Sequence, residues 1–136
     1  MTVFVCIDER GGMMFNKRRQ SRDRKLIEDL VRHANDAAIY ISDYSESLFE
    51  ESEASVICVS NPLESARRDS CAFVENISIS EYLSKIDTLV IYNWNRHYPS
   101  DMKLDVIPSE AGFKLLESYD FEGFSHEKIT KEVYVR

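Results

Sequence analysis

The order of strand-like and helical segments constrains the fold more than any other feature of this sequence. Five short apolar runs, rich in β-branched and aromatic residues, are separated by helical or irregular segments. They are Thr2–Ile7, Ala37–Ile41, Ser55–Val59, Cys71–Val74 and Thr88–Tyr92. Two longer strand patterns, Phe113–Phe121 and Lys128–Val135, then follow one another across a short connection. Parallel strands need crossover connections, whereas antiparallel neighbours need only a turn. We therefore expect one α/β domain over residues 1–136, with three layers and a mostly parallel central sheet that ends in an antiparallel edge hairpin.

The clearest helix is predicted over Arg22–Ala34. Its apolar residues recur at helical spacing and form one stripe, made of Leu26, Ile27, Leu30, Val31 and Ala34. Ser21 is expected to cap the start of this helix. Asp23 lies in the first turn, where a negative charge favours the helix dipole.

Composition excludes several classes of protein. The net charge of −7 argues against a general nucleic-acid or membrane-surface binder, so nucleic acid is not a favoured partner. No apolar run reaches the length of a membrane span, and the run Val3–Ile7 is too short for a signal peptide. Three scattered cysteines without a CxxC pair predict reduced thiols and a cytoplasmic location. Three widely spaced histidines predict no metal site.

Basic residues crowd the segment around the predicted helix start. Two interpretations remain open, a solvated helix start and a site for an anion beside unsatisfied helix amides. For the second, the ligand would be an anionic small molecule or a nucleotide. The candidate ligand-binding residues are Asn16, Arg18, Arg19, Gln20, Ser21, Arg22, Arg96 and His126.

Several motifs occur in the order found in one enzyme family. They are Val3–Asp8 followed by Gly11-Gly12-Met13, Tyr44–Leu48, Val56–Val59 before Asn61-Pro62, His97-Tyr98-Pro99, and Ser125-His126 between the last two strands. In this order the chain resembles dihydrofolate reductase over most of its length, although it is shorter than the enzyme. The resemblance implies a dihydrofolate reductase-like fold.

The departures from that family concern its cofactor. The resemblance implies a glycine pair behind the penultimate parallel strand, where backbone amides approach the cofactor diphosphate, and then a helix. We assign Thr88–Tyr92 to that strand, and Asn93-Trp94-Asn95-Arg96 follows it without a glycine pair or a helix. The segment Lys17–Ser21 also stands where the family has a Pro-Trp element over its substrate. We therefore expect no cofactor and no NADPH-dependent dihydrofolate reductase activity.

Two functional hypotheses follow. The first is a non-redox module that binds an anionic small molecule or nucleotide. The alternative is an enzyme that acts on a nucleotide, RNA or pterin through Asp23 or His126. The resemblance makes Asp23 a counterpart of the family's acid that supports protonation of a pterin ring, but a helix-dipole role is the simpler interpretation. His126 suits a general base, or is only a residue of the hairpin. Ser125 beside it indicates no catalytic triad, because the sequence does not identify a third member. The exposed edge of the last strand allows a homodimer without requiring one.

Overall fold

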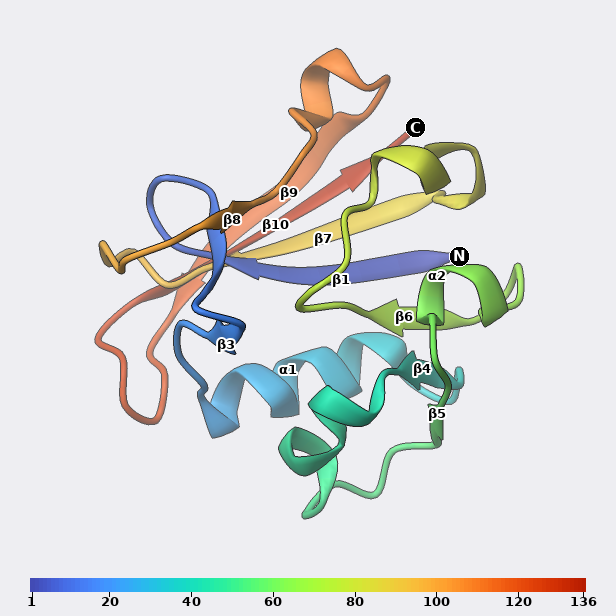
Figure 1. Cartoon of the computed structure of the whole chain (residues 1–136), viewed down its shortest axis with the longest axis horizontal. Helices are drawn as coiled ribbons and strands as arrows, with labels where there is room; N and C mark the ends of the chain where they lie inside the picture. Colours follow the sequence, from blue (N-terminus) through green and yellow to red (C-terminus); the bar gives the residue numbers. More distant parts are fainter.

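The computed structural model describes all 136 residues and contains a seven-stranded mixed sheet (Figure 1). The strand order is β5-β4-β6-β1-β7-β10-β9. The bounds are β1 (Thr2–Ile7), β4 (Ile39–Ile41), β5 (Val56–Cys58), β6 (Cys71–Phe73), β7 (Thr88–Asn93), β9 (Lys114–Phe121) and β10 (Ile129–Val135). The strands β5, β4, β6, β1 and β7 pair in parallel, whereas β10 pairs antiparallel with both β7 and β9. The mostly parallel sheet and its antiparallel edge hairpin are therefore confirmed.

Side chains of the central strand β1 enter the cores on both faces of the sheet. Val3 and Val5 point to one face, and Phe4 points to the other. All three are fully buried. This two-sided burial explains why Val3–Ile7 of β1 is a continuous apolar run instead of alternating with polar residues.

Helices cover both faces of the sheet and make the three predicted layers (Figure 1). One face packs against α1 (Arg24–Ala34) and η1 (Asp43–Phe49), a 3₁₀ helix. The other packs against α2 (Pro62–Ser65) and the 3₁₀ helix η2 (Ser80–Lys85), and a third 3₁₀ turn, η3 (Pro108–Glu110), precedes β9. The structure contains no helix with the length and apolar character that crossing a membrane requires.

A second, three-stranded antiparallel sheet was not predicted. It contains β2 (Gly12–Phe15), β3 (Arg18–Arg19) and β8 (Met102–Lys103), in the order β3-β2-β8. Its strands are too short to give a clear hydrophobic pattern. Asn16 and Lys17 turn the chain between β2 and β3 with φ angles of 51° and 60°, which suit a tight hairpin. A Cβ atom on Gly12 would lie 2.6 Å from Ser100 Cβ, so the close contact requires glycine there.

The predicted helix begins two residues later than expected, and its cap is different. The helix starts at Arg24, and Asp23 is the N-cap. The Asp23 carboxylate accepts hydrogen bonds from the backbone amides of Lys25 and Leu26. Ser21 was therefore the wrong choice of cap, because the carboxylate of Asp23 takes the amides that a cap must satisfy.

The assignment of the family's penultimate parallel strand was also wrong. The strand β7 is the last parallel strand of the chain, and β6 precedes it. Val74-Glu75-Asn76 follows β6 and leads towards η2, so a helical segment does follow the family's penultimate parallel strand. The glycine pair is nevertheless missing at this corrected position, because Glu75-Asn76 stands there.

A buried ion pair ties α1 to the C-terminal hairpin. Lys131 of β10 places its Nζ atom 2.9 Å from Asp29 Oδ2 on α1. The hydroxyl groups of Tyr92 and Tyr119 donate to the same carboxylate at 2.6 and 3.2 Å. Lys131 and Asp29 are both buried, so water has little access to the ion pair.

Candidate functional site

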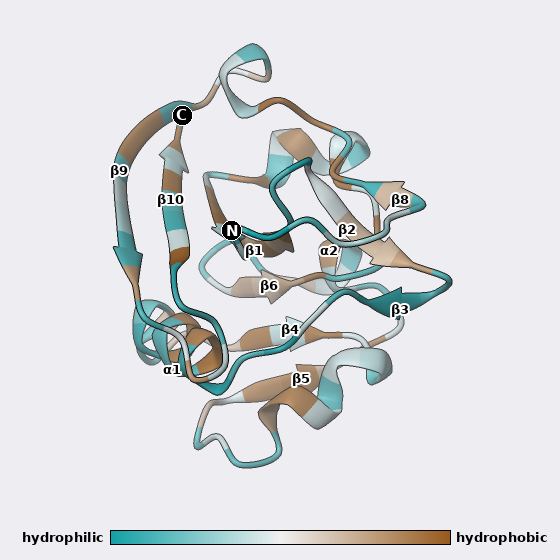
Figure 2. Cartoon of the chain, turned by 90° about the vertical axis from the view of Figure 1, so that its left-hand side faces the viewer, coloured by the Kyte–Doolittle hydropathy of each residue, from teal (hydrophilic) through white to brown (hydrophobic).

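The loop between β9 and β10 folds back over the start of α1 (Figure 2). The backbone amides of Phe124 and Ser125 donate to Asp23 Oδ1 and Oδ2, both at 2.9 Å. These bonds add to the two helix amides that Asp23 already caps. One carboxylate thus holds the N-terminus of the helix and the C-terminal hairpin together.

Gly123 makes this contact sterically feasible. A Cβ atom at this position would lie 2.6 Å from Asp23 Oδ2 and 2.9 Å from Ile129 Cδ1. Separations below about 3 Å do not occur without a shift of one partner. The glycine therefore allows the loop backbone to approach the carboxylate closely.

The hydrogen bonds keep Asp23 ionised. Burial of the side chain raises its pKa, but hydrogen bonds from the Phe124 and Ser125 amides and from the His126 ring outweigh that effect and lower the pKa to about 2. Asp23 is buried and charged at neutral pH, and donors surround both of its oxygens.

His126 links this carboxylate to a serine. Its Nδ1 atom lies 2.8 Å from Asp23 Oδ2, and its Nε2 atom lies 2.8 Å from Ser21 Oγ. The ring is buried and stacks on Trp94, with 4.6 Å between the ring centroids. The Tyr98 hydroxyl approaches Nε2 at 3.4 Å. Because an ionised carboxylate only accepts hydrogen bonds, the proton of the neutral ring is assigned to Nδ1, and Nε2 accepts from the Ser21 hydroxyl.

The three side chains form an Asp23–His126–Ser21 relay that sequence reasoning missed. We considered only Ser125, the neighbour of His126 in the sequence. The serine at Nε2 lies 105 residues earlier, in the segment before α1. No local motif signals the contact, because only the path of the loop after β9 brings His126 close to Ser21.

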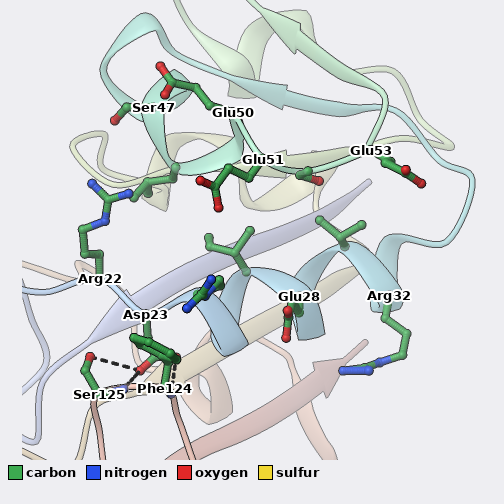
Figure 3. A pocket seen from close by; sticks show the side chains of 15 residues that line it. Arg22, Asp23, Glu28, Arg32, Ser47, Glu50, Glu51, Glu53, Phe124 and Ser125 are labelled. Atoms are coloured by element: carbon green, nitrogen blue, oxygen red, sulfur yellow. Dashed lines mark hydrogen bonds between the residues drawn. The ribbon is translucent and has the colours of Figure 1, made fainter.

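A groove of about 900 Å³ runs between α1 and η1 (Figure 3). Arg22, Arg24, Phe124 and Ser125 line it close to Asp23. The guanidinium of Arg24 lies over the Phe124 ring, 4.2 Å from its centroid. Acidic side chains line the opposite wall, namely Glu50, Glu51 and Glu53. The groove therefore offers cationic groups near Asp23 and carboxylates across from α1, and α1 itself adds Glu28 and Arg32 further along.

The predicted ligand-binding residues lie in different surroundings. Among them, Arg22 lines the groove, while Ser21 and His126 contact each other. The Arg19 guanidinium donates to Glu75 Oε1 and Oε2 at 2.8 and 3.0 Å, so its charge is already paired. The side-chain amide of Gln20 donates to Oδ2 of the buried Asp8 carboxylate at 3.2 Å.

The remaining predicted residues are exposed. Asn16 and Arg18 belong to the β2–β3 hairpin, and Arg96 follows β7. Of the amides that we expected to face an anion at the start of α1, those of Lys25 and Leu26 donate to Asp23 instead. No group of three His, Cys, Asp or Glu side chains has a geometry that could hold a metal ion.

Comparison with known proteins identifies the fold. No protein-family model and no curated protein sequence matches the chain. Among solved structures, a dihydrofolate reductase from Enterococcus faecalis, complexed with NADP(H) and RAB-propyl, matches with a TM-score of 0.70 at 9% sequence identity. The match covers 99% of this chain and 95% of that protein. The chain therefore has a dihydrofolate reductase-like fold.

Proposed function

We propose that the chain binds a small molecule with an anionic group, such as a nucleotide, in the groove between α1 and η1, without redox chemistry. The observation that carries this proposal is the groove itself. Its volume of about 900 Å³ lies within the size range of small-molecule sites. Arg22 and Arg24 line one part of it, and a guanidinium fork suits phosphate or carboxylate oxygens.

The distribution of charge along the groove further restricts the class of ligand that we propose. Glu50, Glu51 and Glu53 line the wall opposite α1, where a second anionic group would be repelled. An amino group would instead donate hydrogen bonds to these carboxylates. The preferred ligand therefore carries its negative charge at one end and amino donors at the other. A nucleotide whose base carries an amino group has this arrangement.

The hydrogen bonds to Asp23 and the position of Glu75 argue against the chemistry of a reductase. Amide and imidazole donors already occupy both Asp23 oxygens, which leaves little capacity to bind a pterin ring. Glu75 follows β6, where the family resemblance implies glycine and a cofactor diphosphate. A carboxylate at that position repels phosphate, and its partner Arg19 is engaged in the ion pair.

We expect no NADPH-dependent reduction of dihydrofolate and no NADPH binding in the micromolar range. The reason is the glutamate, and the missing glycine pair, behind β6. Calorimetric titration of the purified chain with NADPH and an absorbance assay with dihydrofolate test this prediction. A micromolar dissociation constant for NADPH would contradict the non-redox proposal.

Replacement of Arg22 and Arg24 by alanine is expected to weaken binding of the anionic ligand in the groove at least tenfold. Each substitution removes charge-assisted hydrogen bonds to the ligand. A panel of nucleoside monophosphates and inorganic phosphate is first screened by thermal stabilisation, because a ligand that binds only the folded state raises the melting temperature. The tightest member is then titrated calorimetrically against wild type and the Arg22→Ala/Arg24→Ala variant.

Arg67→Ala/Arg68→Ala is the matched control, because it also removes two positive charges, and both arginines are exposed and lie outside the groove. It should leave the affinity unchanged. Equal weakening by both variants would indicate only a general loss of positive charge. Unchanged affinity in the double variant would place the ligand elsewhere.

The contact between Asp23 and His126 favours a second candidate, an enzyme that acts through these two residues. His126 has one nitrogen fixed by a carboxylate and the other against a hydroxyl. This arrangement supports proton transfer at that hydroxyl. It suits nucleophilic chemistry better than protonation of a pterin, because His126 is itself one of the donors that occupy Asp23.

A further inference from the structure

We propose that Ser21 is a nucleophile activated by His126 and Asp23, and that it attacks the carbonyl carbon of small acyl esters. The proposal does not depend on a ligand in the groove. Its geometric basis is the unbroken relay, with 2.8 Å from Asp23 Oδ2 to His126 Nδ1 and 2.8 Å from His126 Nε2 to Ser21 Oγ. Nucleophile, base and orienting carboxylate at such distances are the recognisable parts of a serine hydrolase.

The position of His126 does not depend on Ser21. The ring is fixed by the Asp23 carboxylate at Nδ1 and by the Trp94 face. Asp23 is itself fixed by four backbone amides. The base is therefore held in one orientation, and its Nε2 atom remains available to take the proton of the hydroxyl.

Ser21 meets the requirements of the reacting group. It is only partly buried, whereas Asp23 and His126 are buried. The backbone amides of Arg22 and Asp23, directly after the serine, donate no hydrogen bond within the chain. Amides adjacent to a nucleophile can stabilise the oxyanion of a tetrahedral intermediate. The exposed Arg22 side chain favours esters whose acid carries a further negative group.

The reaction balances with water as the only co-reactant. Ser21 Oγ bonds to the acyl carbon while its proton passes to His126 Nε2, and that proton then goes to the departing alcohol as the ester bond breaks. The product is an acyl ester of Ser21. Water next attacks this ester and gives its proton to Nε2. Collapse of the intermediate returns the proton to Ser21 and releases the carboxylic acid.

The decisive experiment is active-site labelling. The folded full-length protein is incubated with a fluorophosphonate, which phosphonylates activated serines and releases fluoride, and the modified residue is located by peptide mass spectrometry. We expect labelling at Ser21. The Ser21→Ala variant should lose at least 100-fold in labelling rate, together with any burst of p-nitrophenol from p-nitrophenyl acetate.

Ser118→Ala is the matched control, because Ser118 is an exposed serine on the edge strand β9. It should label at the wild-type rate. His126→Gln tests the base and should lower the labelling of Ser21 by a similar factor while the melting temperature is monitored. If His126→Gln does not fold, the comparison of Ser21→Ala with Ser118→Ala still decides the question. Labelling no faster than in the urea-unfolded chain, or labelling that survives Ser21→Ala, would overturn the proposal.

Discussion

Replacement of Asp23 by alanine is expected to lower the free energy of unfolding by about 3–5 kcal/mol, because each buried donor left without an acceptor costs about 1–3 kcal/mol. The carboxylate is the common acceptor for the start of α1, the β9–β10 loop and the His126 ring. Without it, buried donors lose their partner and the helix loses its cap. Urea unfolding followed by circular dichroism measures the change.

Acid titration provides the internal check on this prediction. The folded-state pKa of Asp23 is about 2, below the unfolded value of 3.8. Ionised Asp23 therefore stabilises the fold fully above about pH 5, and this contribution of about 2 kcal/mol is lost as the pH falls towards 2. The Asp23→Ala variant should lack this part of the acid dependence. Asp36→Ala, which removes an exposed carboxylate, should retain it. Identical acid profiles for Asp23→Ala and wild type would contradict the role assigned to Asp23.

Lys131→Met is expected to destabilise the protein by about 3 kcal/mol, because it leaves the buried Asp29 carboxylate with only the exposed Arg32 guanidinium, 3.9 Å away, as a cation. Methionine keeps the apolar stem that packs near Tyr92 and Tyr119. The loss therefore reports the ion pair more than the packing. Equilibrium unfolding in urea gives its size.

A double-mutant cycle separates the pair from its surroundings. Asp29→Leu alone should also be strongly destabilising, because it leaves the buried ammonium group of Lys131 without its carboxylate partner. The Asp29→Leu/Lys131→Met protein should lose less stability than the sum of the two single changes, since neither buried charge remains. Strict additivity would show that the two side chains do not stabilise each other.

The sequence predicts the large elements because their patterns are local. The helix ending at Ala34 has a continuous apolar stripe, and the last two strands are long and joined by a short loop. The sheet containing β2, β3 and β8 escapes prediction for the opposite reason. Two of its strands have only two residues, and β8 lies far along the chain from β2.

The candidate site was predicted in part. Asp23 and His126 were singled out separately, from the helix dipole and from general-base chemistry. Their contact was not, because it depends on how closely the loop after β9 packs against Asp23 at Gly123. The role of Glu75 was missed as well, since we assigned the family's cofactor segment to Thr88–Tyr92. Short parallel strands resemble one another in sequence, and only the pairing of β6 between β1 and β4 identifies the right one.

The contact between Asp23 and His126 also has a consequence for how the protein folds. The two residues are 103 positions apart in the chain, so a ribosome makes α1 long before it makes the loop that covers it. Contacts of such sequence separation form slowly, because loop-closure entropy is lost before they form. In a nascent chain that ends before the hairpin, Asp23 would cap its helix with one carboxylate oxygen free in water, and Ser21 would have no base. The same bonds that stabilise the finished protein therefore assemble its candidate site only as the last two strands dock.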